Sequence, residues 1–392
     1  MKSEESVDVI VIGLGGVGSA TVAALAADGY RVIGIDQFSP PHQRGSSHGQ
    51  TRVIRKAYFE HPDYVPMLLR AYDQWKQLEA VSGKQLYYPV GLLQIGPVDG
   101  EVLAGVRRSS IEHSLDVQYM AMQEAQSQYP GIQGDPSWSA IVEHDAGYLL
   151  VEQCIEAHLQ QAQRHGASLL LNQSVRDWSI DGSGVRVVTD EQELHADRLV
   201  IAAGPWADKC LKRYQLPLRV LRKHVYWYEV EAGHYQSGNF PCFFFDTPQG
   251  FFYGIPQVAN SYEANGQGTT SQRNWGGLKI GRHTGGQLAD PDMSIEHPED
   301  AEDQSLVEQF LADCMPAVTR NRIAWQGCYY TMTPDQHFIV DSLPDCPQVS
   351  VVAGLSGHGF KFTCVLGEIA ANLATKRPSP VNIDFLSLTR FL

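Results

Sequence analysis

Short apolar runs alternate with glycine turns and with segments of helical period along most of the chain. The first run, VDVIVIGLGGVG, has the length of a strand, turns at glycines, continues as a helix from Gly16 and leads to a second apolar strand that ends at Asp36. Apolar residues recur at helical spacing over 64–81 and near 151–165, whereas 91–97 has the short apolar run of a strand. The pattern therefore predicts an α/β fold.

The same strand–turn–helix order returns twice further along the chain. One unit lies in DRLVIAAGPWADKCL (197–211) and another in VSVVAGLSGHGFKFTCVLGEIAANLA (349–374). Between them, 217–230 and 243–255 are rich in aromatic and β-branched residues, which predicts a β-sheet region. The polar segment 260–274 predicts a mobile or lid-like loop. We therefore expect a discontinuous nucleotide-binding domain with an inserted β-rich substrate domain.

The composition argues against several classes of function. The chain has 392 residues and a net charge of −14, which argues against nucleic acid as the main partner. No apolar run is long enough to span a bilayer. The N-terminus MKSEES is acidic rather than basic, so no signal peptide is indicated and a cytoplasmic location is expected. The cysteines are odd in number and contain no Cys-x-x-Cys, which indicates neither a disulfide framework nor a metal site.

Gly13, Gly15 and Gly18 have the G-x-G-x-x-G spacing of a dinucleotide-binding turn. The first glycine allows the tight turn, the second lets a diphosphate approach the backbone, and the third lets the helix pack on the strand. The helix directs its positive end at the diphosphate, and Asp36 ends the next strand, where a carboxylate can accept ribose hydroxyls. An acid there favours NAD or FAD over NADP, and the motif does not distinguish these two. The discontinuous organisation favours FAD, because a simple NAD dehydrogenase usually keeps its nucleotide unit contiguous.

Three polar segments carry candidate chemistry. GSSHGQTRVIRKAY (45–58) concentrates positive charge, either as an inward-facing cluster or as a solvated basic face. In GGLKIGRHT (276–284), strand alternation places Lys279 and His283 on one face, which is either a site or a solvent-facing polar stripe. In GLSGHGFKF (354–362), backbone amides and a helix N-terminus would stabilise a developing anion, although such glycines also serve ordinary turns.

Taken together, these segments resemble the monomeric sarcosine oxidase family of FAD-dependent amine oxidoreductases, and within it the N-methyltryptophan oxidases. The resemblance covers essentially the whole chain and rests on four blocks in family order: PPHQRGSSHGQTRVIRKAY, GLKIGRHTGGQ, GCYYTMTPDQHFIVD and GLSGHGFKFTCVLGEIAA. It implies an α/β fold of the D-amino-acid-oxidase type. A Rossmann-like FAD-binding domain would consist of 1–85, 146–215 and 322–392, and an inserted β-rich substrate domain would consist of 86–145 and 216–321.

The resemblance also assigns roles to individual residues. It implies one FAD per chain, attached covalently as an 8α-S-cysteinyl flavin at Cys328, and such a thioether would raise the flavin's reduction potential. Arg55 and Lys361 match the residues that bind the substrate carboxylate, and Lys279 matches the lysine that activates oxygen. His283 matches a histidine near the substrate amine. The other matched positions are Tyr253 and Tyr330 in the substrate cavity and, at the cofactor, Ser46, His48, Thr51, Arg52, Val175, Gly204, Gly357, Gly359 and again Lys361. Lys279, His283, Arg52 and Tyr330 form the expected catalytic set.

The expected activity is the oxidation of an N-methyl amino acid, such as N-methyl-L-tryptophan or sarcosine, by O₂. The products would be the demethylated amino acid, formaldehyde and H₂O₂. The aromatic segments leave open a cavity for a large side chain or a plain strand core, and the segment 258–275, longer than in the family, could cap that cavity. We expect a monomer with no nucleic acid, membrane or metal partner. The alternatives are a flavin dehydrogenase of proline or pipecolate with another acceptor, an NAD-linked reductase, and an FAD module in tRNA modification.

Overall fold

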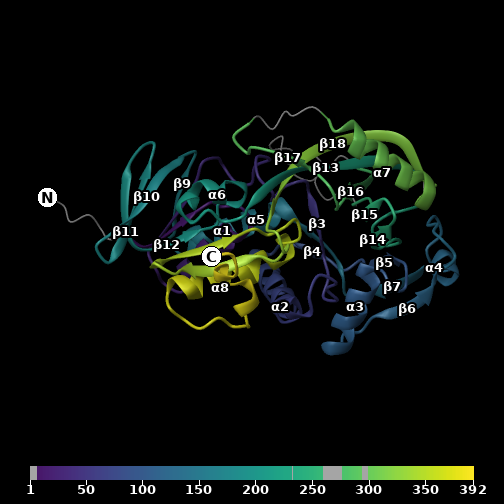
Figure 1. Ribbon diagram of the computed structural model, residues 1–392, viewed down its shortest axis with the longest axis horizontal. Helices are drawn as coiled ribbons and strands as arrows, with labels where there is room; N and C mark the ends of the chain where they lie inside the picture. Colours follow the sequence, from purple (N-terminus) through teal and green to yellow (C-terminus); the bar gives the residue numbers. More distant parts are fainter. Residues whose placement is uncertain (1–6, 232, 259–275, 294–298) are drawn as a thin grey trace.

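Two large sheets and one small sheet organise the part of the chain that the structure describes. The computed structural model describes residues 7–231, 233–258, 276–293 and 299–392. One large sheet lies at the left of Figure 1 and the other at the right. The loop expected at 260–274 lies outside the described residues, as does nearly all of the segment 258–275 that we expected to cap the cavity.

The first sheet has the parallel order expected of a nucleotide-binding unit. β1 (Val7–Ile12) lies between β2 (Val32–Asp36) and β12 (Glu193–Ile201) and runs parallel to both. β9 (Ser168–Leu171) extends the sheet beyond β2, and β20 (Cys346–Ala353) extends it beyond β12. Because these strands come from the beginning, middle and end of the chain, the discontinuous organisation of this sheet is confirmed.

Antiparallel strands and a small sheet complete this half of the molecule. β10 (Val175–Asp181) and β11 (Gly184–Thr189) form a hairpin that pairs with β12, and β19 (Ile339–Leu343) pairs with β20. The small sheet has the order β3 (Thr51–Ile54), β8 (Gly147–Leu150) and β4 (Tyr87–Tyr88). β4 falls outside the residue range that we expected for the FAD domain, and the domain boundaries stay a prediction.

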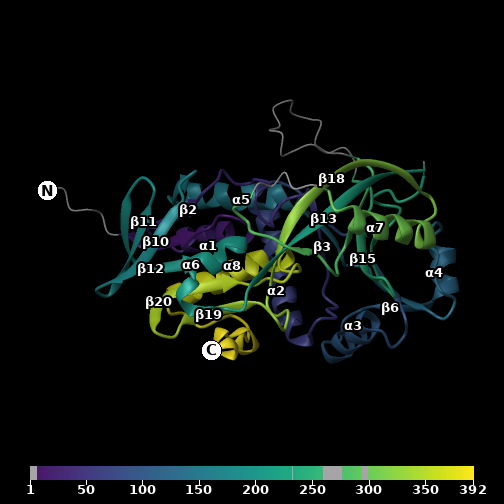
Figure 2. The same ribbon diagram turned by 45° about the horizontal axis from the view of Figure 1, so that its top comes forward.

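The helices that begin at Gly16 (α1), Val151 (α5) and Thr363 (α8) form a layer on the first sheet, in which α1 contacts the other two (Figure 2). The α-helices of the described residues are, in chain order, α1 (Gly16–Ala27), α2 (Val65–Ser82), α3 (Glu101–Glu112), α4 (Met122–Gln128), α5 (Val151–Arg164), α6 (Ala207–Cys210), α7 (Ala301–Cys314) and α8 (Thr363–Ala374). Short 3-10 turns lie at Pro62–Tyr64, Gly204–Trp206, Lys212–Tyr214, Phe360–Phe362, Asp384–Leu386 and Leu388–Phe391. α1 is apolar nearly all round, and its burial against two helices and a sheet follows from that composition.

The second large sheet carries the β-rich part of the chain. Its strands, in spatial order, are β17 (Gln287–Leu288), β13 (Arg219–Val230), β16 (Leu278–Arg282), β15 (Gly250–Ile255), β14 (Cys242–Thr247), β5 (Leu92–Gly96), β7 (Ser139–Glu143) and β6 (Gln118–Ala121). β18 (Val318–Met332) pairs with β13, and the two strands run side by side from the middle of the molecule towards its right end (Figures 1 and 2). The β-rich region predicted over 217–230 and 243–255 is confirmed.

Strand alternation divides the aromatic residues of β14 and β15 between the two faces of this sheet. Phe245 and Phe252 pack on Phe310 of α7, with ring centroids 5.1 and 4.4 Å away. Their sequence neighbours Phe244 and Tyr253 belong to the cluster on the opposite face. The aromatic segments therefore serve partly as core and partly as the lining of a cavity described below.

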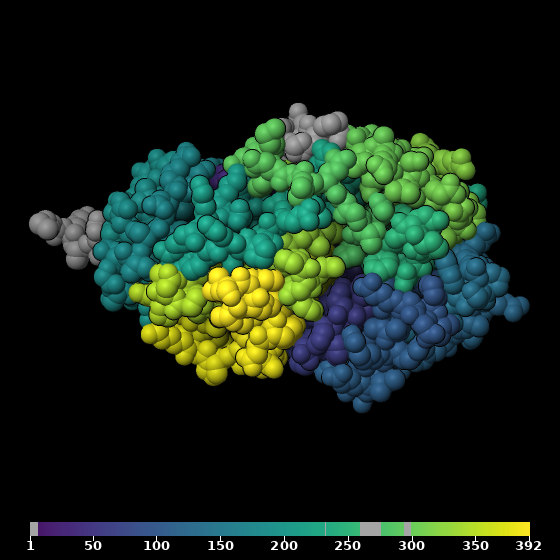
Figure 3. Space-filling view, in the orientation of Figure 1, coloured from purple at the N-terminus to yellow at the C-terminus, as the bar shows by residue number. Residues whose placement is uncertain are grey.

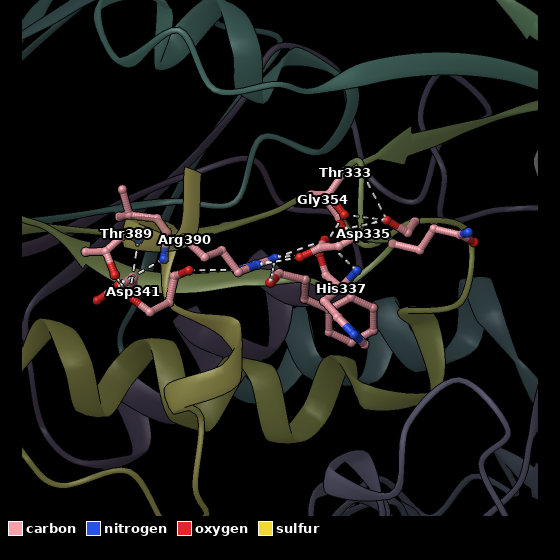
Figure 4. Close-up of polar contacts among 12 residues, drawn as sticks. Thr333, Asp335, His337, Asp341, Gly354, Thr389 and Arg390 are labelled. Carbon is pink, nitrogen blue, oxygen red and sulfur yellow. Dashed lines mark hydrogen bonds and ion pairs between the residues drawn. The ribbon is translucent and has the colours of Figure 1, made fainter. Parts of the chain in front are cut away.

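The end of the chain is bound to the segment that follows β18. The Arg390 Nε donates to Asp335 Oδ2 at 2.8 Å, and its Nη2 donates to the carbonyl oxygen of His337 at 2.9 Å (Figure 4). The Thr333 hydroxyl donates to the same carbonyl at 2.7 Å, and the Thr333 amide donates to Ser356 Oγ at 3.3 Å. The C-terminal residues, yellow on the face in Figure 3, thereby support the glycine-rich loop that contains Ser356.

The other local predictions from the sequence agree with the structure. The helices predicted over 64–81 and near 151–165 are α2 and α5, and the strand predicted at 91–97 is β5. Within the four described stretches, no helix has the length and apolar character needed to cross a membrane.

Gly18 is the position where the fold of the first turn is most sensitive to a single methyl group. A Cβ at Gly18 would lie 1.7 Å from the Gly13 carbonyl oxygen. We expect Gly18→Ala to lower the free energy of unfolding by about 1–3 kcal/mol, measured by urea denaturation, because α1 must move away from β1. Gly45→Ala is the control, since its Cβ would meet nothing closer than His42 Cε1 at 3.7 Å, and it should change stability by less than about 0.5 kcal/mol. Equal stability of the two variants would contradict the prediction.

Candidate functional site

A cavity of about 390 Å³ is lined by residues from both large sheets. Its volume lies within the range of small-molecule and cofactor sites. The lining begins at Gly13 and Asp36 in the first sheet and reaches Tyr253 and His283 in the second. The cavity is therefore an extended space that can hold a dinucleotide at one end and a second molecule at the other.

The predicted dinucleotide turn forms one wall of this cavity. Gly13 has φ +88°, and a Cβ there would lie 2.5 Å from the Ala202 carbonyl oxygen, so the turn requires glycine. A Cβ at Gly15 would meet nothing closer than Ser47 Oγ at 3.6 Å, which leaves space over the turn for a ligand. The Gly16 amide at the start of α1 donates to Ser47 Oγ at 3.2 Å. A diphosphate fits the N-terminus of α1 as the sequence predicts.

Asp36 lies at the end of β2 and also lines the cavity. Its Oδ2 accepts a hydrogen bond from the Leu14 amide at 2.7 Å, and its Oδ1 accepts one from the Phe38 amide at 2.9 Å. A carboxylate oxygen has more than one acceptor position, so both oxygens can still accept a ribose hydroxyl. These two backbone amides therefore hold the Asp36 side chain in place beside the dinucleotide turn.

Two cations meet at the other end of the cavity, on the ring of Tyr58. The Arg55 guanidinium carbon lies 4.4 Å from the ring centroids of Tyr58 and Phe59, and its Nη2 is 2.7 Å from Glu60 Oε1. The Lys361 Nζ lies 5.2 Å from the Tyr58 centroid and donates to the His358 carbonyl at 2.7 Å. The structure therefore brings together the two residues that the family resemblance matches to the substrate carboxylate.

Burial changes the protonation of this end of the cavity. Arg55 and Lys361 are 4% and 6% exposed. Burial, reinforced by the charge of Arg55, lowers the pKa of Lys361 to about 7. The N–H donors of Arg55 Nη1 have no hydrogen-bond partner among the described residues. The Thr363 hydroxyl, which is also unpaired, lies instead beside Gly16 at the dinucleotide turn. An anion with oxygen acceptors would satisfy donors that are otherwise unpaired.

Aromatic and imidazole rings surround the same end. His283, one residue past β16, has its ring centroid 5.7 Å from that of Tyr330 and 6.4 Å from that of Tyr253. Its distance to the Phe244 centroid is 5.9 Å. Burial lowers the pKa of His283 to about 3, so the imidazole is neutral at physiological pH. A neutral imidazole among aromatic rings can accept a hydrogen bond from an amine.

Arg52 connects the cavity to a buried layer behind it. Arg52 lines the cavity, and its Nη1 donates to the Thr51 carbonyl at 2.9 Å. Lys279, 2% exposed, donates from Nζ to the carbonyl oxygens of Gly49 at 2.5 Å and Thr51 at 2.8 Å. Burial, together with the charge of Arg52, holds the pKa of Lys279 well below its usual range. Lys279 therefore lies behind the cavity wall, next to Arg52.

Cys328 also lies in this buried layer. Its thiol is 4% exposed, and the cysteine is free. Burial raises the pKa of the thiol, while the charges of Arg52, Lys279 and Lys223 act in the opposite direction. β18 also carries Tyr330, two residues further on, into the cavity lining. On balance the pKa of this buried thiol is raised, and the three nearby cations limit that shift without reversing it.

The predicted site residues fall into two groups. Those that line the cavity are Gly13, Gly15, Asp36, Ser46, Arg52, Arg55, Val175, Gly204, Tyr253, His283, Tyr330, Gly357, Gly359 and Lys361. Those that are buried outside the lining are Gly18, His48, Thr51, Lys279 and Cys328. Burial lowers the pKa of His48 to about 3, and its Nε2 lies 2.9 Å from the Gly45 carbonyl. Sequence reasoning did not single out Glu60, Phe244 or His358, which also line the cavity.

The missed residues differ in how they could have been found. Phe244 follows from strand alternation, because Tyr253 faces it across the β14–β15 pair. Glu60 lies five residues after Arg55, outside any strand or helix, so its pairing with Arg55 has no periodic signal. Among the residues described by the structure, no group of three or more His, Cys, Asp or Glu side chains is arranged to hold a metal ion.

Comparison with known proteins gives the family of this chain. A family model described as FAD dependent oxidoreductase matches residues 8–373. The chain is 34% identical over 395 residues to the monomeric sarcosine oxidase of Arthrobacter sp. (strain TE1826), with 100% of this chain and 98% of the relative covered. It is 35% identical over 386 residues to the N-methyl-L-tryptophan oxidase of Yersinia pestis (strain Pestoides F), with 98% and 99% covered.

Solved structures agree with this at the level of the fold. The chain superposes on NikD, an unusual amino acid oxidase essential for nikkomycin biosynthesis, with a TM-score of 0.83 at 23% identity, covering 98% of this chain and 97% of that one. For glycine oxidase from Geobacillus kaustophilus the TM-score is 0.79 at 18% identity, with 99% of both chains covered. The extent of these matches, together with a cavity that fits a dinucleotide, shows that the chain belongs to the FAD dependent oxidoreductase family.

Proposed function

We propose that this protein is an oxidase of N-methyl amino acids such as N-methyl-L-tryptophan or sarcosine. The methyl C–N bond would be oxidised to an imine, and water would hydrolyse the imine to formaldehyde and the demethylated amino acid. O₂ would receive the two electrons and leave as H₂O₂. The observation that carries the proposal is the convergence of Arg55 and Lys361 on one tyrosine ring, at the cavity end opposite the dinucleotide turn.

In this proposal the two cations bind and orient the substrate carboxylate. Arg55 is held between ring faces, and Lys361 is held by the His358 carbonyl, so neither cation needs to reorganise. Glu60 occupies one edge of the guanidinium, and Nη1 stays available to an incoming carboxylate. Such positioning can contribute up to about 7–11 kcal/mol to a reaction barrier. The neutral His283 would accept a hydrogen bond from the substrate amine.

The remaining residues would hold the cofactor and tune its environment. Bound FAD supplies the electron acceptor for the amine and the electron donor for oxygen. We place its diphosphate at Gly13, Gly15 and the start of α1, and its ribose at Asp36. We also propose a covalent thioether to the Cys328 sulfur, because cations surround that thiol. A monomer in the cytoplasm, with the domain boundaries given above, completes the proposal.

A substrate panel tests the proposed activity directly. Purified protein would be mixed anaerobically with sarcosine, N-methyl-L-tryptophan, proline or pipecolate while its visible spectrum is recorded. We expect the flavin to bleach with the N-methyl amino acids, with a higher kcat/KM for N-methyl-L-tryptophan than for sarcosine. Bleaching by proline or pipecolate alone, or no oxygen uptake after bleaching, would instead support the dehydrogenase alternative.

The covalent linkage has a simple test. Acid precipitation of the wild-type protein should leave a yellow pellet, whereas Cys328→Ala should release the colour into the supernatant. Cys154→Ala is the matched control, because Cys154 is equally buried but lies in the core cluster of the first sheet. A white wild-type pellet, or a yellow one from Cys328→Ala, would show that Cys328 does not carry the flavin.

Lys361 should make carboxylate binding depend on pH. The amine is charged below its pKa of about 7 and neutral above it. The dissociation constant of an acetate-type inhibitor, read from the flavin spectrum, should therefore be nearly constant below pH 7 and rise up to about tenfold per pH unit above it. Lys361→Met should remove this dependence and weaken binding by about 1.5–3 kcal/mol. An unchanged profile in Lys361→Met would remove this residue from the site.

Lys279 should act on oxygen rather than on the amine. Electron transfer to O₂ creates negative charge on a small buried molecule, which a fixed cation stabilises strongly in a low-dielectric site. In Lys279→Met, which keeps the chain length without the charge, anaerobic reduction by substrate should survive far better than reoxidation by O₂. Reoxidation should slow by orders of magnitude in stopped-flow mixing. Reoxidation near the wild-type rate would mean that another cation stabilises the negative charge that forms on oxygen.

A further inference from the structure

A buried carboxylate that no sequence motif marks lies behind the cavity. Glu152, in the first turn of α5, is 4% exposed and does not line the cavity. Its Oε1 accepts hydrogen bonds from the Gly49 amide at 2.8 Å and the Gln50 amide at 3.1 Å. The carboxylate therefore binds a backbone segment about 100 residues away in the sequence rather than a cation directly.

That segment also binds Lys279. The peptide group between Gly49 and Gln50 donates its N–H to Glu152 and accepts Lys279 Nζ on its carbonyl oxygen at 2.5 Å. One peptide unit thus joins the carboxylate to the ammonium group. Hydrogen bonds in such a chain polarise one another, so the negative charge strengthens the acceptor that faces Lys279.

The segment has a backbone conformation that needs external support. Gly49 has φ +85° and Gln50 has φ +69°, which is a left-handed conformation that a non-glycine residue rarely adopts. The Trp227 indole donates to Gln50 Oε1 at 3.2 Å, and the Lys279 Nζ lies 5.4 Å from the same indole ring. Glu152, Trp227 and Lys279 therefore converge on the same two residues.

The charges in this layer are unevenly balanced. The titratable groups that act on Lys279 are Arg52 from β3, Cys328 from β18, Cys242 from β14 and Glu152 from α5. Arg52 disfavours the ammonium, and Glu152 is the carboxylate of this set. Lys279 and Arg52 are in turn the cations that act on Glu152. Burial raises the pKa of Glu152, and the charges of Lys279 and Arg52 oppose that shift. The buried carboxylate is therefore the counter-charge to one cation that lines the cavity, Arg52, and to one that lies behind its wall, Lys279.

We propose that Glu152 is a positioning residue for Lys279, which fixes the Gly49–Gln50 peptide and keeps the lysine charged for its action on oxygen. The proposal rests on the role proposed above for Lys279. The direction of the expected change in the pKa of Lys279 follows from the charges. Burial and Arg52 lower this pKa, and Glu152 raises it. Removal of the negative charge should therefore lower the pH above which Lys279 loses its proton.

Glu152→Gln separates the charge from the shape, because a glutamine oxygen can still accept from both amides. We expect the rate of reoxidation by O₂ to fall with rising pH at a midpoint at least about 1 pH unit lower than in the wild type. Anaerobic reduction by substrate should stay within about twofold. Glu152→Asp, which keeps the charge, should have a midpoint between the two. A wild-type profile in Glu152→Gln would overturn the proposal.

A second measurement does not depend on activity. The melting temperatures of Glu152→Gln, Lys279→Met and the double variant form a cycle. Each single variant leaves one buried charge uncompensated, so the double variant should melt above the temperature expected from adding the two losses. If Glu152→Gln alone does not fold, the double variant should recover folded protein. Additive losses, or no recovery, would contradict the coupling.

The two experiments distinguish this proposal from the proposed function. If Lys279→Met reoxidises normally while the melting temperatures are coupled, the electrostatic link holds and the oxygen role of Lys279 is wrong. If Lys279→Met reoxidises slowly while Glu152→Gln behaves as wild type and the melting losses add, the oxygen role holds and the positioning role of Glu152 is wrong.

Discussion

The burial of positive charge around one cavity is the constraint to which the rest of the structure is adapted. Among the residues that the structure describes, the Lys and Arg side chains that are at least nine-tenths buried are Arg55, Lys223, Lys279 and Lys361. Removing an ion from water is costly unless partners replace the solvent. Three carboxylates, Glu60, Glu152 and Asp303, and several backbone carbonyls supply those partners. The carbonyls of Gly49, Thr284 and His358 belong to turns or loops, so loop geometry and charge stability depend on each other.

Because these partners compensate the buried cations only in part, a protein of net charge −14 can still present positive charge to the carboxylate substrate that we propose. Burial lowers the pKa of Lys361 to about 7 and that of Lys223 to about 8. The cations are therefore short of negative charge, and a carboxylate that enters the cavity supplies it at low cost. The free-energy cost of removing these cations from water is incurred when the protein folds, and a bound anion would offset part of that cost. Long-range attraction contributes less, because the net charge of the chain is −14.

The sequence predicted the parts of the site whose geometry is local. The roles of Gly13 and Asp36 follow from a glycine turn and a strand end within the first thirty-six residues. The motif left the choice between NAD and FAD open, and family membership decides it in favour of FAD. Glu152 could not be predicted in this way, because its partners Gly49 and Gln50 lie 103 and 102 residues away and no pattern joins them. An isolated acid in the first turn of a helix usually serves the helix dipole.

The same constraint links the cavity to the buried layer behind it through one backbone oxygen. The Thr51 carbonyl accepts hydrogen bonds from both Arg52 Nη1 and Lys279 Nζ, at 2.9 and 2.8 Å. Arg52 lines the cavity, whereas Lys279 does not. A change in the charge or position of Arg52 therefore affects Lys279 through this shared acceptor and through the Coulomb repulsion between the two cations. The sites that we propose for the carboxylate and for oxygen therefore belong to one electrostatic cluster. Substitutions in this cluster should have non-additive effects on flavin reduction and on reoxidation.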